Sequence, residues 1–311
     1  MEIEELKSFL AVVREQSISQ AANALHLTQP TLSTRIRKLE EKLGFLLLDR
    51  NWKGITLTPE GHYFLPYAIK LLNELNNAST VITSYERYGL ENFNNVSPDR
   101  KEHLTIGINA WLAPAFTNEI MRAISGIFPQ QKFQFITRPT NNLKEMLHYG
   151  SIDIGIYYGN EREANLVEEN LMYDELTLLC SKEEEGLVIS DINEVAALDK
   201  PFLLFDNPAL ANNRTFYKEI FERLRVEKFQ LVDDLSVMSS YVASNNGFTI
   251  LPKSVITELY SSKIQVVELG DLLSPMEIKL SYGNHTIFKN IAKELYHELL
   301  AHCDKGVVAA G

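Results

Sequence analysis

Cationic and hydrogen-bonding side chains gather between residues 28 and 53, and their types suit contact with nucleic acid. A guanidinium can bind the O6 and N7 edge of guanine, a glutamine amide can bind adenine, and hydroxyl and ammonium groups bind phosphate oxygens. This composition predicts a DNA-binding surface made of Thr28, Gln29, Pro30, Thr31, Ser33, Thr34, Arg35, Arg37, Lys38, Arg50 and Lys53.

Within this surface, the expected roles differ. Arg35 is the candidate reader of a base edge, and Gln29, near a helix start, is the second. The remaining cations and Ser33 are expected to hold phosphates, which fixes the register without reading the sequence. The alternative is an ordinary charged helix facing solvent, and charge alone does not separate the two interpretations.

Three short helices are predicted to position these residues. Apolar residues at helical spacing predict an amphipathic helix over residues 3–15. Ser17 or Ser19 can cap a second helix that buries Ala21 and Ala22. Thr28 is a natural N-cap for a third helix that ends at Gly44. Its core stripe is Leu32, Ile36, Leu39 and Leu43.

A hairpin is expected to follow the third helix. Residues 45–48 and 55–58 read as strands around a basic turn, which is the pattern of a wing. Together the three helices and the wing predict a winged helix-turn-helix over residues 1–58, with the third helix lying in the major groove.

A longer helix begins near Pro59 and carries a heptad pattern. The apolar residues alternate in steps of three and four, which predicts a coiled-coil seam between two copies of the chain. An ordinary core-facing helix is the alternative. The seam residues are Phe64, Ala68, Leu71, Leu75, Ala78 and Ile82. The helix is expected over residues 59–88, and a polar stretch over 89–102 reads as a hinge.

Beyond residue 102, strands alternate with helices in two successive sets, which predicts two α/β lobes with parallel sheets. The strands are expected at 104–109, 132–137, 152–157, 202–205, 229–233 and 248–251, with helices at 114–128, 141–149, 209–224 and 235–244. We expect this domain to span 103–311, with lobe I at about 103–174 and 276–302 and lobe II at about 175–275.

The composition of the 311 residues limits the function. The net charge is −11, and the acidic excess lies after residue 60, so only a local basic patch can bind DNA. This disfavours a nucleoid-like structural DNA binder. Two cysteines without a disulfide pattern, no secretory signal at the start and no long apolar run predict a soluble cytoplasmic protein.

Motifs for catalysis are not found. The seven histidines show no metal-ligand spacing, and the sequence has no nucleophile elbow, phosphate loop or dinucleotide fingerprint. Cys180 follows an apolar run and is expected to be buried. We therefore expect no catalytic residues, no metal and no cofactor, although an α/β catalytic domain carrying a DNA-binding head remains the rival class.

The amino-terminal residues resemble the LysR-type transcriptional regulators over a long, spaced signature. Two positions depart from it: Leu48 stands where Phe is frequent, and Arg35 stands where Gln is frequent. The matching residues are Leu6, Phe9, Val12, Ser19, Ala21, Ala22, Leu25, Thr28, Gln29, Pro30, Leu32, Ser33, Ile36, Leu39, Glu40, Leu43, Gly44, Arg50, Leu57, Thr58 and Gly61. Later, Gly150, Asp153 and Gly155 resemble the family's strand motif. The segment 242–252 resembles its glycine-containing run, with Asn245 replacing the first glycine.

This resemblance implies a periplasmic-binding-protein-like effector domain with a small ligand between two lobes. Ligands of open parallel sheets settle beyond the carboxyl ends of strands. Arg138 favours a carboxylate-bearing effector, and Trp111 suits stacking on a ring; turn formation or helix capping is the alternative for each residue. The candidate ligand residues are Asn109, Ala110, Trp111, Arg138, Thr140, Asp206, Asn207, Asn245, Asn246 and Gly247.

The expected function is therefore sequence-specific transcriptional regulation controlled by a small-molecule effector. The expected partners are double-stranded operator DNA, the effector and a second copy of the chain. By resemblance the working form is a tetramer, and RNA polymerase is a further candidate partner. No membrane partner is expected.

Overall fold

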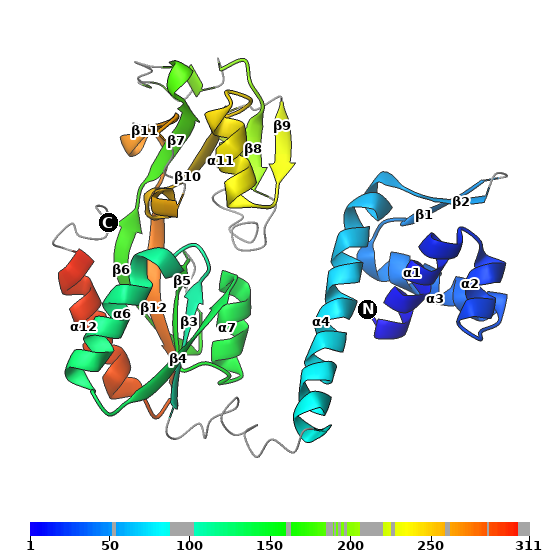
Figure 1. The fold of residues 1–311 in the computed structure, drawn as a ribbon, viewed down its shortest axis with the longest axis horizontal. Coiled ribbons are helices and arrows are strands. Elements are labelled where there is room, and N and C mark those ends of the chain that lie inside the picture. Colours follow the sequence, from blue (N-terminus) through cyan, green and yellow to red (C-terminus); the bar gives the residue numbers. More distant parts are fainter. Residues whose placement is uncertain are drawn as a thin grey trace. The chain divides into compact units, whose positions relative to one another are not determined.

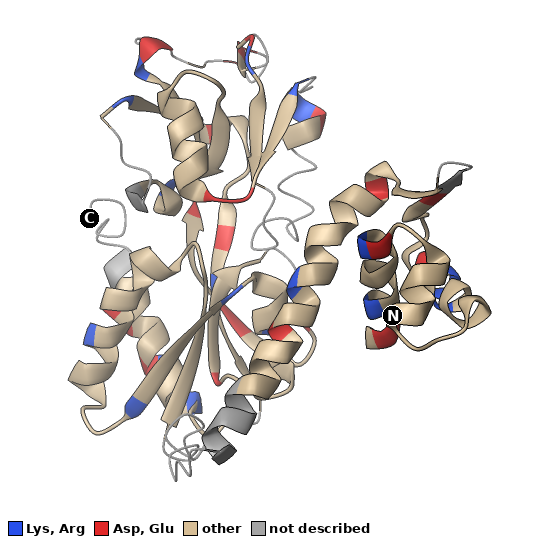
Figure 2. Ribbon diagram, turned by 45° about the vertical axis from the view of Figure 1, so that its right-hand side comes forward, with Lys and Arg blue, Asp and Glu red and all other residues tan. Residues whose placement is uncertain are grey.

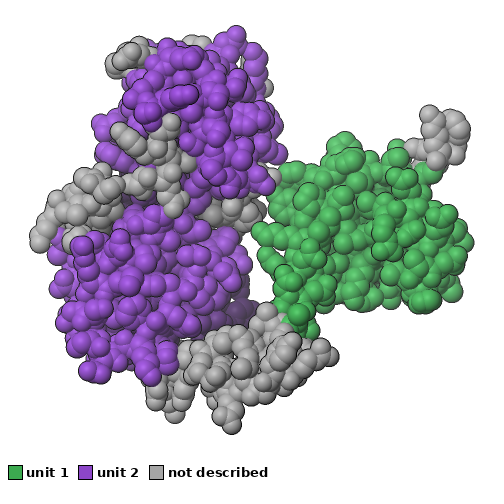
Figure 3. All heavy atoms as spheres, in the orientation of Figure 1, with its two compact units in different colours: residues 1–97 green, residues 98–311 purple. Residues whose placement is uncertain are grey.

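The computed structural model describes residues 1–51, 54–87, 103–159, 163–184, 189, 191, 194, 195, 198–205, 220–224, 228–258, 262–284 and 286–303. The chain divides into two compact units, residues 1–97 and 98–311 (Figure 3). Each unit has its own hydrophobic core. The predicted hinge at 89–102 lies outside the described residues.

Three helices form the body of unit 1: α1 (Ile3–Glu15), α2 (Ile18–Ala24) and α3 (Gln29–Leu43). The predicted caps are confirmed. The Ser17 hydroxyl accepts from the Gln20 N–H at 3.3 Å, and the Thr28 hydroxyl accepts from the Thr31 N–H at 3.3 Å. Gly44 ends α3 at φ 83°, a left-handed conformation that glycine adopts without strain. The core stripe of α3 packs on α1 and α2. The buried residues are Leu32, Ile36 and Leu39 of α3, Phe9 and Val12 of α1, and Ala21 and Ala22 of α2.

The wing is shorter than predicted. Strand β1 (Leu48–Asn51) pairs antiparallel with β2 (Gly54–Leu57), and Leu48 lies opposite Leu57. The expectation of a strand from residue 45 was wrong. The N–H groups of Leu47 and Leu48 donate instead to the Glu40 Oε1 atom of α3, at 2.8 and 3.2 Å, so the backbone before Leu48 is tied to the helix.

Helix α4 (Pro59–Arg87) starts against this wing and continues beyond the core. Thr58 caps it by accepting from the Gly61 N–H at 2.9 Å. Early in the helix, Phe64 packs on Phe9 with ring centroids 5.8 Å apart, and Ala68 is buried. Further along, Leu71 and Leu75 are 38% and 43% exposed, so within one chain this apolar stripe is only partly covered.

Lobe I of unit 2 is built on a five-stranded sheet of order β4-β3-β5-β12-β6. Helices α6 (Ala113–Ile127) and α12 (Lys289–Cys303) cover one face, and α7 (Thr140–His148) covers the other (Figure 1). The strands are β3 (His103–Asn109), β4 (Lys132–Arg138), β5 (Ile154–Tyr158), β6 (Leu166–Asp174) and β12 (Met276–Gly283).

Lobe II is also of α/β type. Its paired sheets have the orders β8-β9 and β10-β7-β11, and a parallel bridge from Phe202 to Phe248 joins them. Helix α11 (Leu235–Ala243) packs on this sheet. Short 3-10 turns follow strand β7 at Lys182–Glu184, β10 at Lys253–Glu258 and β11 at Gly270–Leu272. The strands are β7 (Leu176–Ser181), β8 (Phe202–Phe205), β9 (Phe229–Val232), β10 (Thr249–Pro252) and β11 (Ile264–Glu268).

Both sheets are mixed rather than parallel, which corrects the prediction. In lobe I, β12 runs antiparallel to β5 and β6, and in lobe II, β7 runs antiparallel to β10 and β11. The reason is the connection between lobes: the chain leaves lobe I along β6 into β7, with only Glu175 between them, and returns along β12. Most of the predicted helix 209–224 lies outside the described residues.

Candidate nucleic-acid interface and effector region

The outer face of α3 carries the polar residues that the sequence indicated. Thr31, Thr34 and Lys38 are exposed, and the Arg37 side chain is 69% exposed, all on the side away from the core stripe. Gln29 and Pro30 are exposed at the helix start, next to the cap formed by Thr28. The ribbon in Figure 2 is coloured by charge and shows both basic and acidic positions along the helices of unit 1.

A groove of about 680 Å³ runs between this face and the wing. Pro30, Ser33, Thr34 and Arg37 line its helix side, and Leu46, Leu48 and Asp49 line the other. The structure thus brings four of the predicted DNA-binding residues together along one groove. Lys53 and the side chain of Arg50 lie outside the described residues.

Arg35 lies on the opposite flank of α3, toward α1. Its Nη1 atom is 3.4 Å from the Glu4 Oε2 atom, and its side chain is 28% exposed. Lys42, seven residues later, lies on the same flank and bonds both carboxylate oxygens of Glu5, at 2.8 and 3.0 Å. The candidate base reader is therefore paired with an acid in the free protein.

Two glutamates have structural roles that the sequence did not reveal. Glu40 is buried in α3 and ties the wing to it, as described above. Glu5 is 2% exposed, accepts from the Glu2 N–H at 2.8 Å, and so closes a capping box at the start of α1. The hydrogen bond from Lys42 lowers the pKa of Glu5 and keeps it ionised. The only sequence signal was a carboxylate inside an apolar helical stripe.

In lobe I, the predicted effector residues Asn109, which ends β3, and Thr140, which follows β4, meet at the carboxyl ends of these parallel strands. The Asn109 side chain is fully buried, and its Nδ2 atom donates to the Thr140 hydroxyl at 3.1 Å. That hydroxyl donates in turn to the Tyr158 carbonyl at 3.3 Å. Thr140 is not the cap of α7, since Pro139 holds that position.

Trp111 is part of the core rather than an open stacking surface. It is 4% exposed, and its ring centroid lies 4.9 Å from that of Phe205 in lobe II. The backbone N–H of Trp111 donates to the Asn109 Oδ1 atom at 3.0 Å. Ala110 and Arg138 are exposed at the same strand ends. Asp206 and Asn207 lie outside the described residues.

Asn245, Asn246 and Gly247 do not belong with these residues, which corrects the prediction. They precede β10, so they lie at the amino end of that strand, whereas Phe205 lies at the carboxyl end of β8, which runs parallel to it. The Asn245 Nδ2 atom donates to the Glu183 Oε2 atom at 2.7 Å. The predicted left-handed backbone of Asn245 is confirmed at φ 61°.

A buried polar cluster joins the lobes where the chain crosses between them. The Tyr158 and Ser254 hydroxyls both donate to the Asp174 Oδ2 atom, at 2.8 and 2.5 Å, and the Ser254 N–H donates to its Oδ1 atom at 3.1 Å. Burial raises the pKa of Asp174, although these hydrogen bonds favour the ionised form. The residues come from three distant segments, and local sequence patterns gave no signal for their contact.

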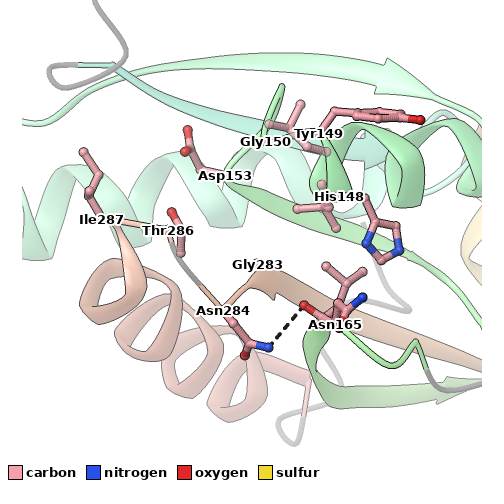
Figure 4. Close-up of a pocket in the computed structure, with 12 residues that line it drawn as sticks. His148, Tyr149, Gly150, Asp153, Asn165, Gly283, Asn284, Thr286 and Ile287 are labelled. Carbon is pink, nitrogen blue, oxygen red and sulfur yellow. Dashed lines mark hydrogen bonds between the residues drawn. The ribbon is translucent and has the colours of Figure 1, made fainter.

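A pocket of about 580 Å³ opens at the opposite end of the lobe I sheet, where β5 and β6 begin and β12 ends (Figure 4). His148 and Tyr149 from the end of α7 line it, with Asn284 and Ile287 from the segment after β12. Asp153, from the motif noted in the sequence, also lines the pocket; its Oδ2 atom accepts from the Thr105 N–H at 2.8 Å. This aspartate therefore ties β5 to β3.

Several features bear on other classes of function. Cys180 is buried, and burial raises the pKa of its thiol to about 11, so the thiol is protonated at neutral pH. Within the described ranges, no cluster of three or more His, Cys, Asp or Glu side chains is arranged to hold a metal ion. In the same ranges, no helix combines the length and apolar character needed to cross a bilayer.

Comparison with known proteins accounts for both units. Residues 3–62 match the family described as bacterial regulatory helix-turn-helix protein, lysR family, and residues 98–304 match the LysR substrate binding domain.

Individual relatives match along most of the chain. The chain is 27% identical to the transcriptional regulator BenM of Acinetobacter baylyi over 265 residues, covering 82% of this chain and 81% of BenM. It is 28% identical to the regulator YofA of Bacillus subtilis, with coverage of 91% and 92%. The fold matches a solved structure of full-length BenM with a TM-score of 0.56 at 24% identity, covering 98% of each chain. A structure of full-length CbnR with its target DNA matches with a TM-score of 0.51 at 19% identity, covering 96% of this chain and 100% of CbnR. The chain belongs to the LysR family, and it is a DNA-binding transcriptional regulator with an effector-binding domain.

Proposed function

We propose that unit 1 binds operator DNA with the exposed face of α3 in the major groove. The observation that supports this most strongly is the arrangement of α3 itself. Its inner stripe packs on α1 and α2, while Thr31, Thr34, Arg37 and Lys38 project from the capped helix into solvent. The groove beside the wing gives the DNA backbone a second surface to contact.

The exposed part of α4 is proposed to pair two copies of the chain. Leu71, Leu75 and Ala78 continue the spacing of the buried Ala68 but are exposed within one chain. Pairing of this stripe with its counterpart would remove it from water. Two recognition helices would then face half-sites separated by about one helical turn or a multiple of it. A tetramer, formed from two such dimers, is the proposed working form.

Unit 2 is proposed to hold a small-molecule effector between its lobes, near the Asn109–Thr140 pair. Arg138, exposed at the adjacent strand end, favours a carboxylate on the effector. Binding there need only favour one lobe arrangement over another, because an effector shifts an equilibrium by its difference in affinity for the two states. No chemical change of the effector is proposed. The protein is proposed to act in the cytoplasm, where operator DNA and RNA polymerase are found.

The DNA-binding proposal is tested by selection. The full-length chain would be incubated with a pool of random duplexes, and repeated capture should enrich one sequence that footprinting then locates. Arg37→Ala should weaken binding to that duplex several-fold, because it removes one exposed cation from the proposed interface. Arg122→Ala is the matched control, since Arg122 is 75% exposed on α6 and pairs with Glu119 of its own helix, as Arg37 pairs with Glu41 of α3. Enrichment of no sequence, or equal losses in both variants, would contradict the proposal.

The effector proposal is tested by thermal shift of the full-length chain against small carboxylates, amino acids and aromatic compounds. A compound that stabilises unit 2 should lose this effect in Thr140→Val. Asn246→Ala is the control, because Asn246 precedes β10 and lies at the amino end of the parallel strands of lobe II, away from the proposed site. Equal loss in both variants would argue against the site at the strand ends.

A further inference from the structure

The flank of α3 that faces α1 is covered by carboxylates from the first turn of α1. Glu4 and Glu5 lie in that turn, and Glu2 is its N-cap. Arg35 faces Glu4 at 3.4 Å, while Lys42 faces Glu5 at 2.8 Å and Glu2 at 3.7 Å. The positive charge that α3 offers on this flank is therefore balanced within the free protein.

Glu4 and Glu5 differ in what they do for the fold. Glu5 is buried and serves the capping box. Glu4 is 52% exposed, and its carboxylate bonds Lys7 at 2.9 Å as well as Arg35. An exposed ion pair contributes little to stability. A carboxylate in the first turn also interacts favourably with the helix dipole, which gives an ordinary structural reason for Glu4.

The Glu4–Arg35 ion pair affects DNA binding because Arg35 belongs to the proposed recognition helix. The guanidinium lies on the flank of the proposed recognition helix, so it must leave Glu4 to reach a duplex. A bidentate contact with a guanine edge is stronger than an exposed ion pair, whereas a single phosphate contact is of comparable strength. Operator DNA can therefore draw Arg35 away from Glu4, and random DNA gains little by doing so.

We propose that Glu4 is a specificity-determining residue that withholds Arg35 from random DNA. This inference rests on the DNA-binding function proposed above. In complexes with random sequence, Arg35 stays with Glu4 and adds no phosphate contact. In the operator complex, Arg35 exchanges Glu4 for a base edge.

The experiment compares Glu4→Gln with the parent chain on two duplexes: one selected by the parent from a random pool, and one scrambled. Affinity is measured from 50 to 200 mM salt. On scrambled DNA the freed Arg35 gains a phosphate contact, so the slope of log K against log salt should steepen by about 0.9. With the steeper slope, the ratio of the affinity at 50 mM salt to the affinity at 200 mM salt should be about 3- to 4-fold larger in Glu4→Gln than in the parent. On the selected duplex the slope should stay as in the parent, so discrimination should fall.

Two further variants separate this mechanism from a general charge effect. Glu15→Gln is the matched control, because Glu15 lies at the other end of α1 and also pairs with a cation, Arg14, at 2.8 Å. It should change neither slope. In an Arg35→Ala background, Glu4→Gln should no longer steepen the slope on scrambled DNA, since the released group is absent.

Three results would overturn the inference: equal changes on both duplexes, equal effects of Glu4→Gln and Glu15→Gln, or a full effect of Glu4→Gln without Arg35. The last would mean that Lys7 or the general field is responsible. Because Glu4 is exposed, the fold is expected to persist, and hydrogen exchange of unit 1 checks this. If the parent chain selects no sequence at all, the proposed function itself fails, which is a different outcome.

Discussion

Gly61 offers the sharpest test of how the wing is held against the recognition helix. A Cβ atom at this position in α4 would lie 2.1 Å from the Leu47 carbonyl oxygen and 3.0 Å from its carbon, whereas ordinary contact begins near 3.4 Å. Gly61→Ala must therefore move the Leu47 backbone by about 1.3 Å.

Two hydrogen bonds hold the Leu47 backbone in place. Its N–H donates to the buried Glu40 carboxylate at 2.8 Å, and its carbonyl accepts from the Thr58 N–H at 3.0 Å. Overpacking costs about 1–3 kcal/mol, and weakening a hydrogen bond to a charged group costs a further 1.5–3 kcal/mol. We expect Gly61→Ala to lower the free energy of unfolding of unit 1 by the sum of these two costs, about 2.5–6 kcal/mol.

Hydrogen exchange followed by mass spectrometry on the full-length chain would measure this, because peptides of unit 2 serve as an internal reference. Gly126→Ala is the matched control: a Cβ atom there meets nothing within 4 Å, so alanine should stabilise α6 by up to about 1 kcal/mol. Destabilisation of unit 1 by Gly61→Ala, together with stabilisation of α6 by Gly126→Ala, would support the geometric argument. A change in unit 1 smaller than about 0.5 kcal/mol for Gly61→Ala would refute it.

Two other predictions concern the dimer and the lobes. Leu75→Lys should weaken the dimer strongly in sedimentation experiments, because it places a charge in the proposed seam. Glu74→Lys adds a lysine at the neighbouring exposed position, and identical sedimentation of the two variants would contradict the seam. Asp174→Ala should lower the free energy of unfolding of unit 2 by about 3 kcal/mol, since the buried hydroxyls of Tyr158 and Ser254 both donate to Asp174. Denaturant titration checks this, with the exposed Asp271→Ala expected to shift the midpoint little; similar shifts would mean that the cluster does not link the lobes.

Local chemistry made unit 1 predictable. The caps at Ser17 and Thr28, the stop at Gly44 and the stripe from Leu32 to Leu39 all depend on residues within a turn or two of each other, and the structure has each of them. The wing was less predictable, because the start of β1 depends on Glu40, which binds the backbone seven and eight residues later.

The sheets of unit 2 were harder to predict for a topological reason. The alternation of strands and helices correctly indicated two α/β lobes. Strands β6, β7, β11 and β12 escaped notice because each pairs with a segment at least 70 residues away, as for Thr249 with Leu179 and Ile278 with Tyr158. The antiparallel pairing of these strands therefore produced no recognisable pattern in the local sequence.

The candidate site shows the same limit. Arg35 was predicted to lie with the DNA-binding residues of the third helix, but its contact with Glu4 was not predicted, because Glu4 lies 31 residues earlier on another helix. Asn245 to Gly247 were misplaced for a simpler reason: they come before a strand rather than after it, so they lie at the wrong end of the sheet. Asn109 and Thr140 do lie together, because one ends β3 and the other follows β4, the parallel strand beside it.

The position of β12 between β5 and β6 bears on how the protein is made. A ribosome completes β12 about 120 residues after β5. Until then, the edges of β5 and β6 that will pair with β12 have no partner strand in the nascent lobe I. Unpaired edges of this kind invite pairing with other chains. A premature stop before residue 276 would thus leave an intact helix-turn-helix joined to an aggregation-prone remnant.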